Sequence, residues 1–130
     1  MRKKQVLLVF MLVGTVGLLQ GCLVAAVGAG AVGTMAYVQG DLEAVESERL
    51  DVVYKATLEA VDELELNVTK KLKDALSAVV VARDAQDRKI TIKLNAAAEK
   101  TTKLSIRVGV FGNETRSRLI YQKIRDNIQQ

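Results

Sequence analysis

The sequence predicts an α+β fold, in which an antiparallel sheet of about five strands carries two helices packed on one face. Three observations predict it. Charged residues become frequent from Gly40 onward, two segments space their apolar residues as helices do, and others alternate apolar with polar residues as strands do. The expected order is strand, helix, four strands, helix. Residues 40–130 are long enough for one such domain.

The first elements of the domain are a short strand at residues 42–45 and a helix. The helix is predicted within SERLDVVYKATLEAVDEL, with Ser47 as its N-cap and Asp51 in its first turn. Its apolar residues recur every three or four positions, which predicts one buried face. They are Leu50, Val53, Tyr54, Leu58, Val61 and Leu64.

Four further strands are expected, at residues 67–72, 76–83, 89–97 and 103–109, with a polar turn at residues 84–87. Alternation is clearest in KITIKLN and KLSIRVG, where every second residue is aliphatic. Gly109 and Gly112 mark a turn around Phe111, and Asn113 is expected to cap a terminal helix. The apolar residues of that helix are Leu119, Ile120, Ile124 and Ile128.

Composition excludes several classes of function. The chain has a formal charge of +4, of which Arg2, Lys3 and Lys4 supply three positive charges. A nucleic-acid-binding protein would carry its Lys and Arg on the folded part, so no nucleic-acid partner is expected. The chain has no His, which excludes a Ser/His/Asp triad and His-containing metal sites. We therefore predict no enzyme activity, catalytic residue, metal or cofactor. The alternative is an enzyme that acts on an envelope polymer, which would need a deep polar cleft with convergent carboxylates.

The N-terminal segment is typical of an exported protein. A positive tip precedes the uncharged run VLLVFMLVGTVGLL at residues 6–19, as in secretory signals. Leu19, Gln20, Gly21 and Cys22 resemble the lipobox of bacterial lipoproteins. In such proteins the signal peptidase cuts between the positions of Gly21 and Cys22. The thiol takes a diacylglyceryl group and the new amine is acylated, so that the acyl chains hold the protein on a membrane. The alternative is an inert cysteine in a signal-anchor helix.

This interpretation divides the chain into a signal peptide at residues 1–21, a lipidated cysteine with a Gly/Ala-rich apolar tether at 22–39, and a periplasm-facing domain at 40–130. Leu23 follows Cys22, and by analogy with lipoprotein sorting the absence of Asp there favours the inner leaflet of the outer membrane over the inner membrane. A helix over residues 23–38 would measure roughly 24 Å, short of the roughly 30 Å hydrocarbon core.

The glycine-rich segment allows two other interpretations. Small residues spaced by four, such as Ala25, Ala29 and Gly33, let helices pack closely in lipid. They support the alternative of an uncleaved integral anchor that self-associates. Gly28, Gly30 and Gly33 also match a dinucleotide fingerprint, but no βαβ pattern surrounds them, so no nucleotide is expected.

The lipobox, the Gly/Ala-rich tether, and the segments GDLEA, LDVVYKATLEAVDEL and KLSIRVGVFGNETRSRLIYQKI together resemble a family of small bacterial lipoproteins known only as a domain of unknown function. The resemblance covers nearly the whole chain. It implies an envelope location and a compact α+β domain, and it brings no catalytic residues.

A candidate interaction surface lies on the polar face of the last two strands. Lys93, Lys103 and Arg107 are expected there, where they could contact lipid headgroups, acidic glycans or an acidic envelope protein. The alternative is a solvated sheet face. We expect Phe111 to close the sheet against a helix, with an exposed anchor for a partner as the alternative. The leading hypothesis is a non-catalytic structural or interaction module, whose oligomeric state the sequence does not predict.

Overall fold

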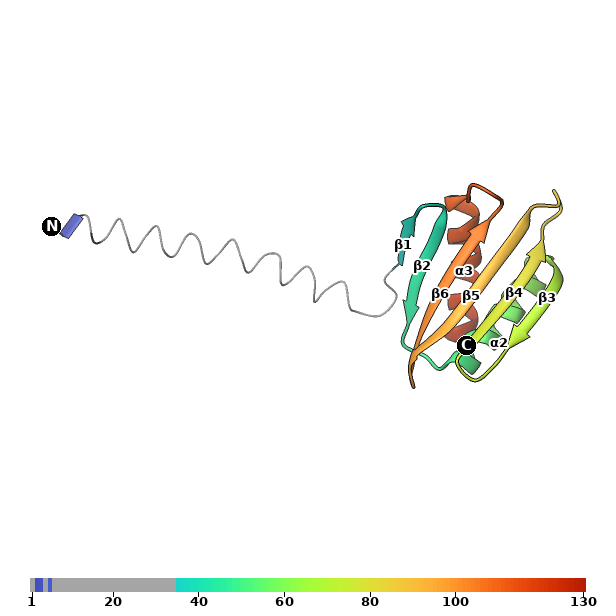
Figure 1. Ribbon diagram of the computed structural model, residues 1–130, viewed down its shortest axis with the longest axis horizontal. Coiled ribbons are helices and arrows are strands. Elements are labelled where there is room, and N and C mark those ends of the chain that lie inside the picture. The colour runs from blue at the N-terminus through green and yellow to red at the C-terminus, as the bar shows by residue number, and fades with distance from the viewer. Residues whose placement is uncertain (1, 4, 6–34) are drawn as a thin grey trace. The chain divides into compact units, whose positions relative to one another are not determined.

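The computed structural model describes residues 2, 3, 5 and 35–130. In residues 35–130 it contains one six-stranded antiparallel sheet of order β1-β2-β6-β5-β4-β3 and two helices (Figure 1). The predicted α+β class and element order are confirmed, with one additional strand. The strands are β1 (Met35–Val38), β2 (Asp41–Glu46), β3 (Asn67–Lys73), β4 (Ser77–Arg83), β5 (Lys89–Ala98) and β6 (Thr101–Val108); the helices are α2 (Leu50–Glu63) and α3 (Glu114–Ile128).

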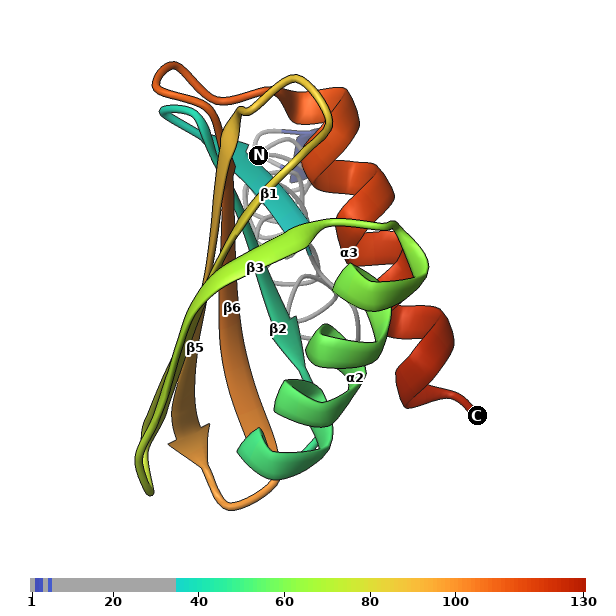
Figure 2. The ribbon, with the colours of Figure 1, turned by 90° about the vertical axis from the view of Figure 1, so that its right-hand side faces the viewer.

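Both helices cover the same face of the sheet and lie side by side (Figure 2). The aliphatic residues that alternate along β5 and β6 point toward the helices and are buried, as predicted. Tyr121 and Ile124 of α3 complete this core from the other side. The opposite face of the sheet carries the intervening residues, and neither α2 nor α3 covers it; we refer to it as the open face.

The additional strand is β1, which pairs with β2 from Met35 opposite Ala44 to Val38 opposite Asp41. These four residues lie in the segment predicted to be a tether, so the sheet begins before the expected boundary at Gly40. Gln39 and Gly40 join the two strands with φ values of 52° and 92°. Two central residues with positive φ make the tight hairpin that suits twisted strands. The sequence MAYV is uncharged and short, so it was not distinguished from the apolar residues before it.

The N-terminal ends of the two helices differ in how they are capped. Asn113 caps α3 as predicted, because its side chain accepts a hydrogen bond from the Arg116 amide at 3.0 Å. The prediction for α2 is wrong at this position. Its N-cap is Arg49, which makes no capping side-chain bond, and Ser47 lies outside the helix. Within the described residues, no helix is both long enough and apolar enough to cross a bilayer.

Candidate interaction surface

The open face brings together the three basic residues that the sequence singled out. Lys93 lies opposite Ser105, Asn95 opposite Lys103, and Thr91 opposite Arg107 on the neighbouring strands β5 and β6. Lys93 and Lys103 are exposed and Arg107 is half-buried. Because side chains alternate between the two faces of a strand, these three point away from the core.

Positive charge is in excess on the open face. The acidic residues there are Asp41 and Glu43, both on β2. The solvent side of α2 has the opposite balance, with acids at Asp51, Glu59 and Asp62. The excess of positive charge on the open face therefore contrasts with the acidic surface of α2. The basic residues of the open face are Lys70, Arg83, Lys89, Lys93, Lys103 and Arg107.

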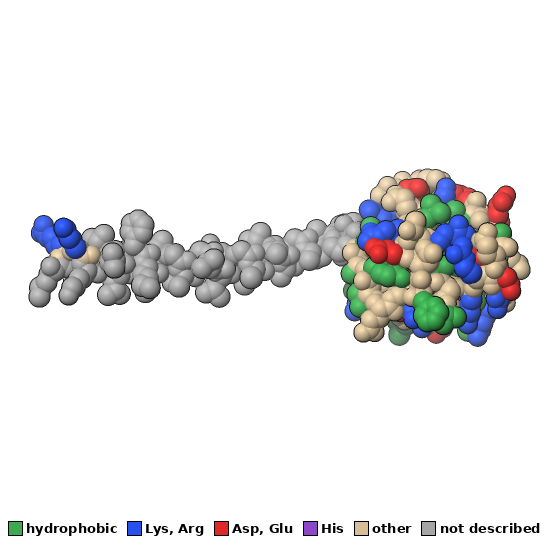
Figure 3. Space-filling view, turned by 90° about the horizontal axis from the view of Figure 1, so that it is seen from above, with side chains coloured by type: hydrophobic (Ala, Val, Ile, Leu, Met, Phe, Trp, Pro, Cys, Tyr) green, Lys and Arg blue, Asp and Glu red, His purple; other side chains and the backbone are tan. Residues whose placement is uncertain are grey.

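A shallow hollow of about 770 Å³ lies at one end of the open face. It is bounded by the loop between β6 and α3 and by basic side chains from β4, β5 and β6. Seen from this end, the molecule presents Lys and Arg side chains beside hydrophobic ones (Figure 3). We call the hollow at this end of the open face the tip hollow. Its lining residues include Arg83, Arg88, Lys89, Thr91, Arg107 and Phe111.

The loop beside the tip hollow carries two apolar side chains in solvent. Val110 is 82% exposed and Phe111 is 92% exposed. The loop bends toward the open face, away from the helices (Figure 2). The expectation that Phe111 closes the sheet against a helix is therefore wrong, because Ile120, Tyr121 and Ile124 already fill that space.

Close backbone contacts fix the loop against the hairpin between β1 and β2. Gly40 and Gly112 have φ values of 92° and 82°, and a Cβ at Gly40 would lie 2.7 Å from the Phe111 carbonyl oxygen. Arg107 Nη1 holds the same hairpin, donating to the Gln39 carbonyl and to Asp41 Oδ1 at 3.1 Å each. Val110 and Phe111, which we call the exposed tip, are thus held in place by contacts that only glycines permit.

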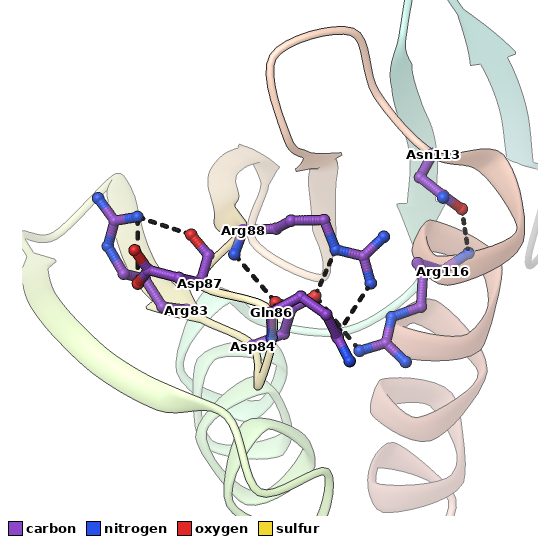
Figure 4. Close-up of polar contacts among 7 residues, drawn as sticks. All are labelled: Arg83, Asp84, Gln86, Asp87, Arg88, Asn113 and Arg116. Carbon is purple, nitrogen blue, oxygen red and sulfur yellow. Dashed lines mark hydrogen bonds and ion pairs between the residues drawn. The ribbon is translucent and has the colours of Figure 1, made fainter.

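The other wall of the tip hollow depends on Asp84, a residue that the sequence analysis placed in a polar turn without a role. Its carboxylate has no exposed surface and accepts hydrogen bonds from the Gln86 amide at 2.9 Å and from Arg88, through the amide at 2.9 Å and Nε at 2.8 Å (Figure 4). Arg116 Nη2 of α3 lies 3.4 Å away. The signal for it was an Asp at the start of a polar turn, where its side chain can accept from the backbone two residues on, as it does from Gln86. The sequence near Asp84 gave no indication of its contact with Arg116 of α3.

Burial would raise the pKa of the Asp84 carboxyl, but hydrogen bonds from the Arg88 backbone and side chain outweigh it and hold the pKa below its usual value. The carboxylate therefore stays charged and keeps its four donors. This arrangement fixes the loop between β4 and β5, and with it the position of Arg88 at the edge of the tip hollow.

The tip hollow is lined by four basic side chains, those of Arg83, Arg88, Lys89 and Arg107. Among the described residues that line it, Asp87 is the only carboxylate, and it pairs with Arg83 at 3.5 Å. No group of His, Cys, Asp and Glu in the described part of the chain has a geometry that could hold a metal ion. Cations beside a projecting apolar tip are chemically suited to contact with an anionic group that also has an apolar part.

The predicted lipidation site, Cys22, and the lipobox residues Leu19, Gln20 and Gly21 lie outside the residues that the structure describes. In comparison with known proteins, a family model described as a protein of unknown function, DUF3568, matches residues 5–127. The match spans both the N-terminal segment and the α+β domain. No curated protein matches the chain.

Proposed function

The chain belongs to the DUF3568 family of proteins of unknown function, and we propose that it is a lipid-anchored protein of the bacterial cell envelope, with a non-catalytic interaction module in the periplasm. The proposal of a lipid anchor rests on a single observation, the order of residues at the N-terminus. A positively charged N-terminus, an uncharged run and the sequence LQGC follow one another at the spacing of a lipoprotein signal.

The folded domain supports the second half of this proposal. Among the residues that the structure describes, the buried members of its core lie within residues 42–124, and Tyr37 and Ile128 pack against them. Its basic open face and exposed tip offer a surface for a partner: the arginines there, Arg83 and Arg107, are held in ion pairs, whereas Lys89, Lys93 and Lys103 form none within the described residues. These properties suit a binding module held near a membrane.

Palmitate labelling combined with intact mass tests the anchor. We expect the wild-type chain in bacteria to incorporate labelled palmitate and to begin at Cys22 with the mass of its acyl groups. The Cys22→Ser variant should remain unlabelled and uncut. Gly21→Leu serves as a matched variant, because it retains the thiol and obstructs cleavage by the signal peptidase.

A wild-type chain of full length without label would contradict the lipoprotein proposal. It would favour an integral protein whose uncleaved anchor self-associates through Ala25, Ala29 and Gly33, and crosslinking of that chain in membranes would then yield oligomers. Membrane fractionation separates the two envelope membranes. We expect the wild type in the outer membrane and a Leu23→Asp variant in the inner membrane.

A further inference from the structure

We propose that the exposed tip, Val110 and Phe111, together with the basic open face, docks on the anionic phosphate surface of a bilayer, with Phe111 entering the headgroup layer. This inference rests on the proposed function in one respect only, since the lipid anchor would keep the domain close to the membrane. The partner is a lipid surface with phosphate headgroups rather than a folded protein.

The tip has the form of an apolar wedge. Val110 and Phe111 are consecutive, project into solvent and are held by Gly112 against the hairpin of β1 and β2. An aromatic anchor for a folded partner usually lies in a well-packed centre surrounded by other contacts. A projecting aromatic needs no complementary pocket when its partner is the fluid interface of a bilayer, where aromatic rings are favoured.

The charges near the tip suit a diffuse negative surface. Within the described part of the chain, Lys89, Lys93 and Lys103 form no ion pair, although most Arg residues of the domain do. The three lysines are spread over two strands and do not converge on one point. Spread, unpaired cations gain by lying near anionic headgroups, each by a modest and additive amount.

The tip hollow gives this contact room for headgroups. It lies between Phe111 and the basic ends of β4, β5 and β6, so a phosphate that enters it meets Lys89 and Arg107 while the ring of Phe111 remains at the rim. Apolar and basic groups therefore face the same direction at one end of the sheet, as in other proteins that lie on membrane interfaces.

The anchor would make a weak contact of this kind effective. Residues 22 to 35 span at most roughly 45 Å when fully extended. A lipidated Cys22 would thus confine the tip to a thin layer above the bilayer, where its effective concentration toward the headgroups is high. Docking would then need only a small intrinsic affinity.

A tryptophan reporter tests the proposal, because the chain has no Trp of its own. The full-length Phe111→Trp variant is produced in bacteria and reconstituted in vesicles of phosphatidylcholine, with or without phosphatidylglycerol. We expect its emission to shift to shorter wavelength, and to be quenched by brominated lipid, only in the vesicles with phosphatidylglycerol. Leu76→Trp is the matched control, because Leu76 is 70% exposed at the opposite end of the sheet and should show neither effect.

Charge variants test the second half of the proposal. Lys89→Gln with Lys93→Gln, introduced in the Phe111→Trp chain, should abolish most of the wavelength shift, and added salt should weaken the shift in the parent. Lys55→Gln on α2 removes one exposed cation from the other side of the domain and should leave the shift unchanged. Circular dichroism checks that each variant keeps the wild-type fold.

Three outcomes would overturn the docking proposal: equal emission in neutral and anionic vesicles, equal shifts at positions 111 and 76, or a shift produced by soluble polyglutamate but not by vesicles. The last result would assign the surface to an acidic protein. Failure of the anchor is measured separately, by the absence of palmitate on Cys22. A labelled chain without the tip shift refutes docking alone, and an unlabelled chain with the shift refutes the anchor alone.

Discussion

At the scale of single residues, Asp84 links two elements that are distant in sequence. Its buried carboxylate collects donors from its own turn and from Arg116 of α3, and these donors keep its pKa low. The carboxylate thus ties the loop between β4 and β5 to a helix on the other side of the core. Its stabilising effect depends on its negative charge, which makes it sensitive to acid.

We expect the free energy of unfolding of Asp84→Asn to fall less steeply than that of the wild type as the pH is lowered into the acid range. The unfolded chain takes up a proton at Asp84 near pH 3.9, whereas the folded chain does so only at lower pH. The stability that the carboxylate contributes is therefore present above about pH 4 and is lost as the pH falls through the folded pKa. Urea unfolding at a series of pH values measures it. Asp62→Asn, on the exposed side of α2, is the control, and parallel acid limbs for Asp84→Asn and wild type would contradict the prediction.

A second buried polar contact joins Tyr121 of α3 to Glu46 of β2. The Tyr121 hydroxyl donates to Glu46 Oε1, and Arg125 Nε lies 3.8 Å from the same oxygen. Glu46 is only 3% exposed. Burial, and then the hydrogen bond and negative charge of Glu46, raise the pKa of Tyr121 above its usual value.

Tyr121→Phe should lower the free energy of unfolding by about 1–3 kcal/mol at neutral pH, because it leaves the buried Glu46 carboxylate without its donor. The neutral hydroxyl stabilises the fold below about pH 10, where the unfolded tyrosine ionises, and this contribution is lost as the pH rises further. Wild type should therefore lose stability above pH 10 more steeply than Tyr121→Phe. Denaturant unfolding measures both effects. Tyr54→Phe is the matched control, and equal losses in the two variants would refute the assignment.

At the scale of elements, the two helices begin in different ways. We expect Asn113→Ala to lower the free energy of unfolding by about 1 kcal/mol, since α3 would lose the side-chain acceptor for the Arg116 amide. Ser47→Ala should change it little, because Ser47 does not cap α2. Thermal unfolding of the two variants compares them directly. A larger loss for Ser47→Ala than for Asn113→Ala would contradict this account.

Elements with strong periodicity were predictable from the sequence. In β5 and β6 every second residue is aliphatic and buried, so burial on one face determined both their type and their orientation. β1 has four residues and its exposed side chains give no alternation, so pairing with β2 rather than local sequence determines its structure. The exposure of Phe111 was not predictable for the same reason. It depends on residues of α3, distant from any local pattern, that fill the core in its place.

The candidate surface was predictable in part for the same reason. The positions of Lys93, Lys103 and Arg107 follow from alternation along two adjacent strands, which a sequence displays directly. The tip hollow cannot be predicted from alternation. It forms only because the hairpin of Gly40, the loop of Gly112 and the turn of Asp84 meet at one end of the sheet. Such contacts between distant segments leave no periodic signal.

At the scale of the folded domain, the two faces of the sheet have different surroundings. One face carries both helices and contains the core, so stability depends on it, whereas the open face contributes little burial and is free to carry unpaired lysines. Mutations on the open face should therefore alter binding without unfolding the domain. This separation makes the lysine and tryptophan variants informative about function.

Hydrogen exchange should follow the order of strands in the sheet. β5 and β6 are flanked on both sides and covered by the helices, so their amides should exchange only through global unfolding. β1 is a four-residue edge strand, and β3 is a mostly exposed edge with a register shift between Val68 and Lys70, so both should exchange through local opening at faster rates. Amide exchange followed by mass spectrometry measures the order. Cys22→Ser should give the same order, because the core lies within residues 42–124, and protection of β1 equal to that of β6 would show that this edge is covered by something other than β2.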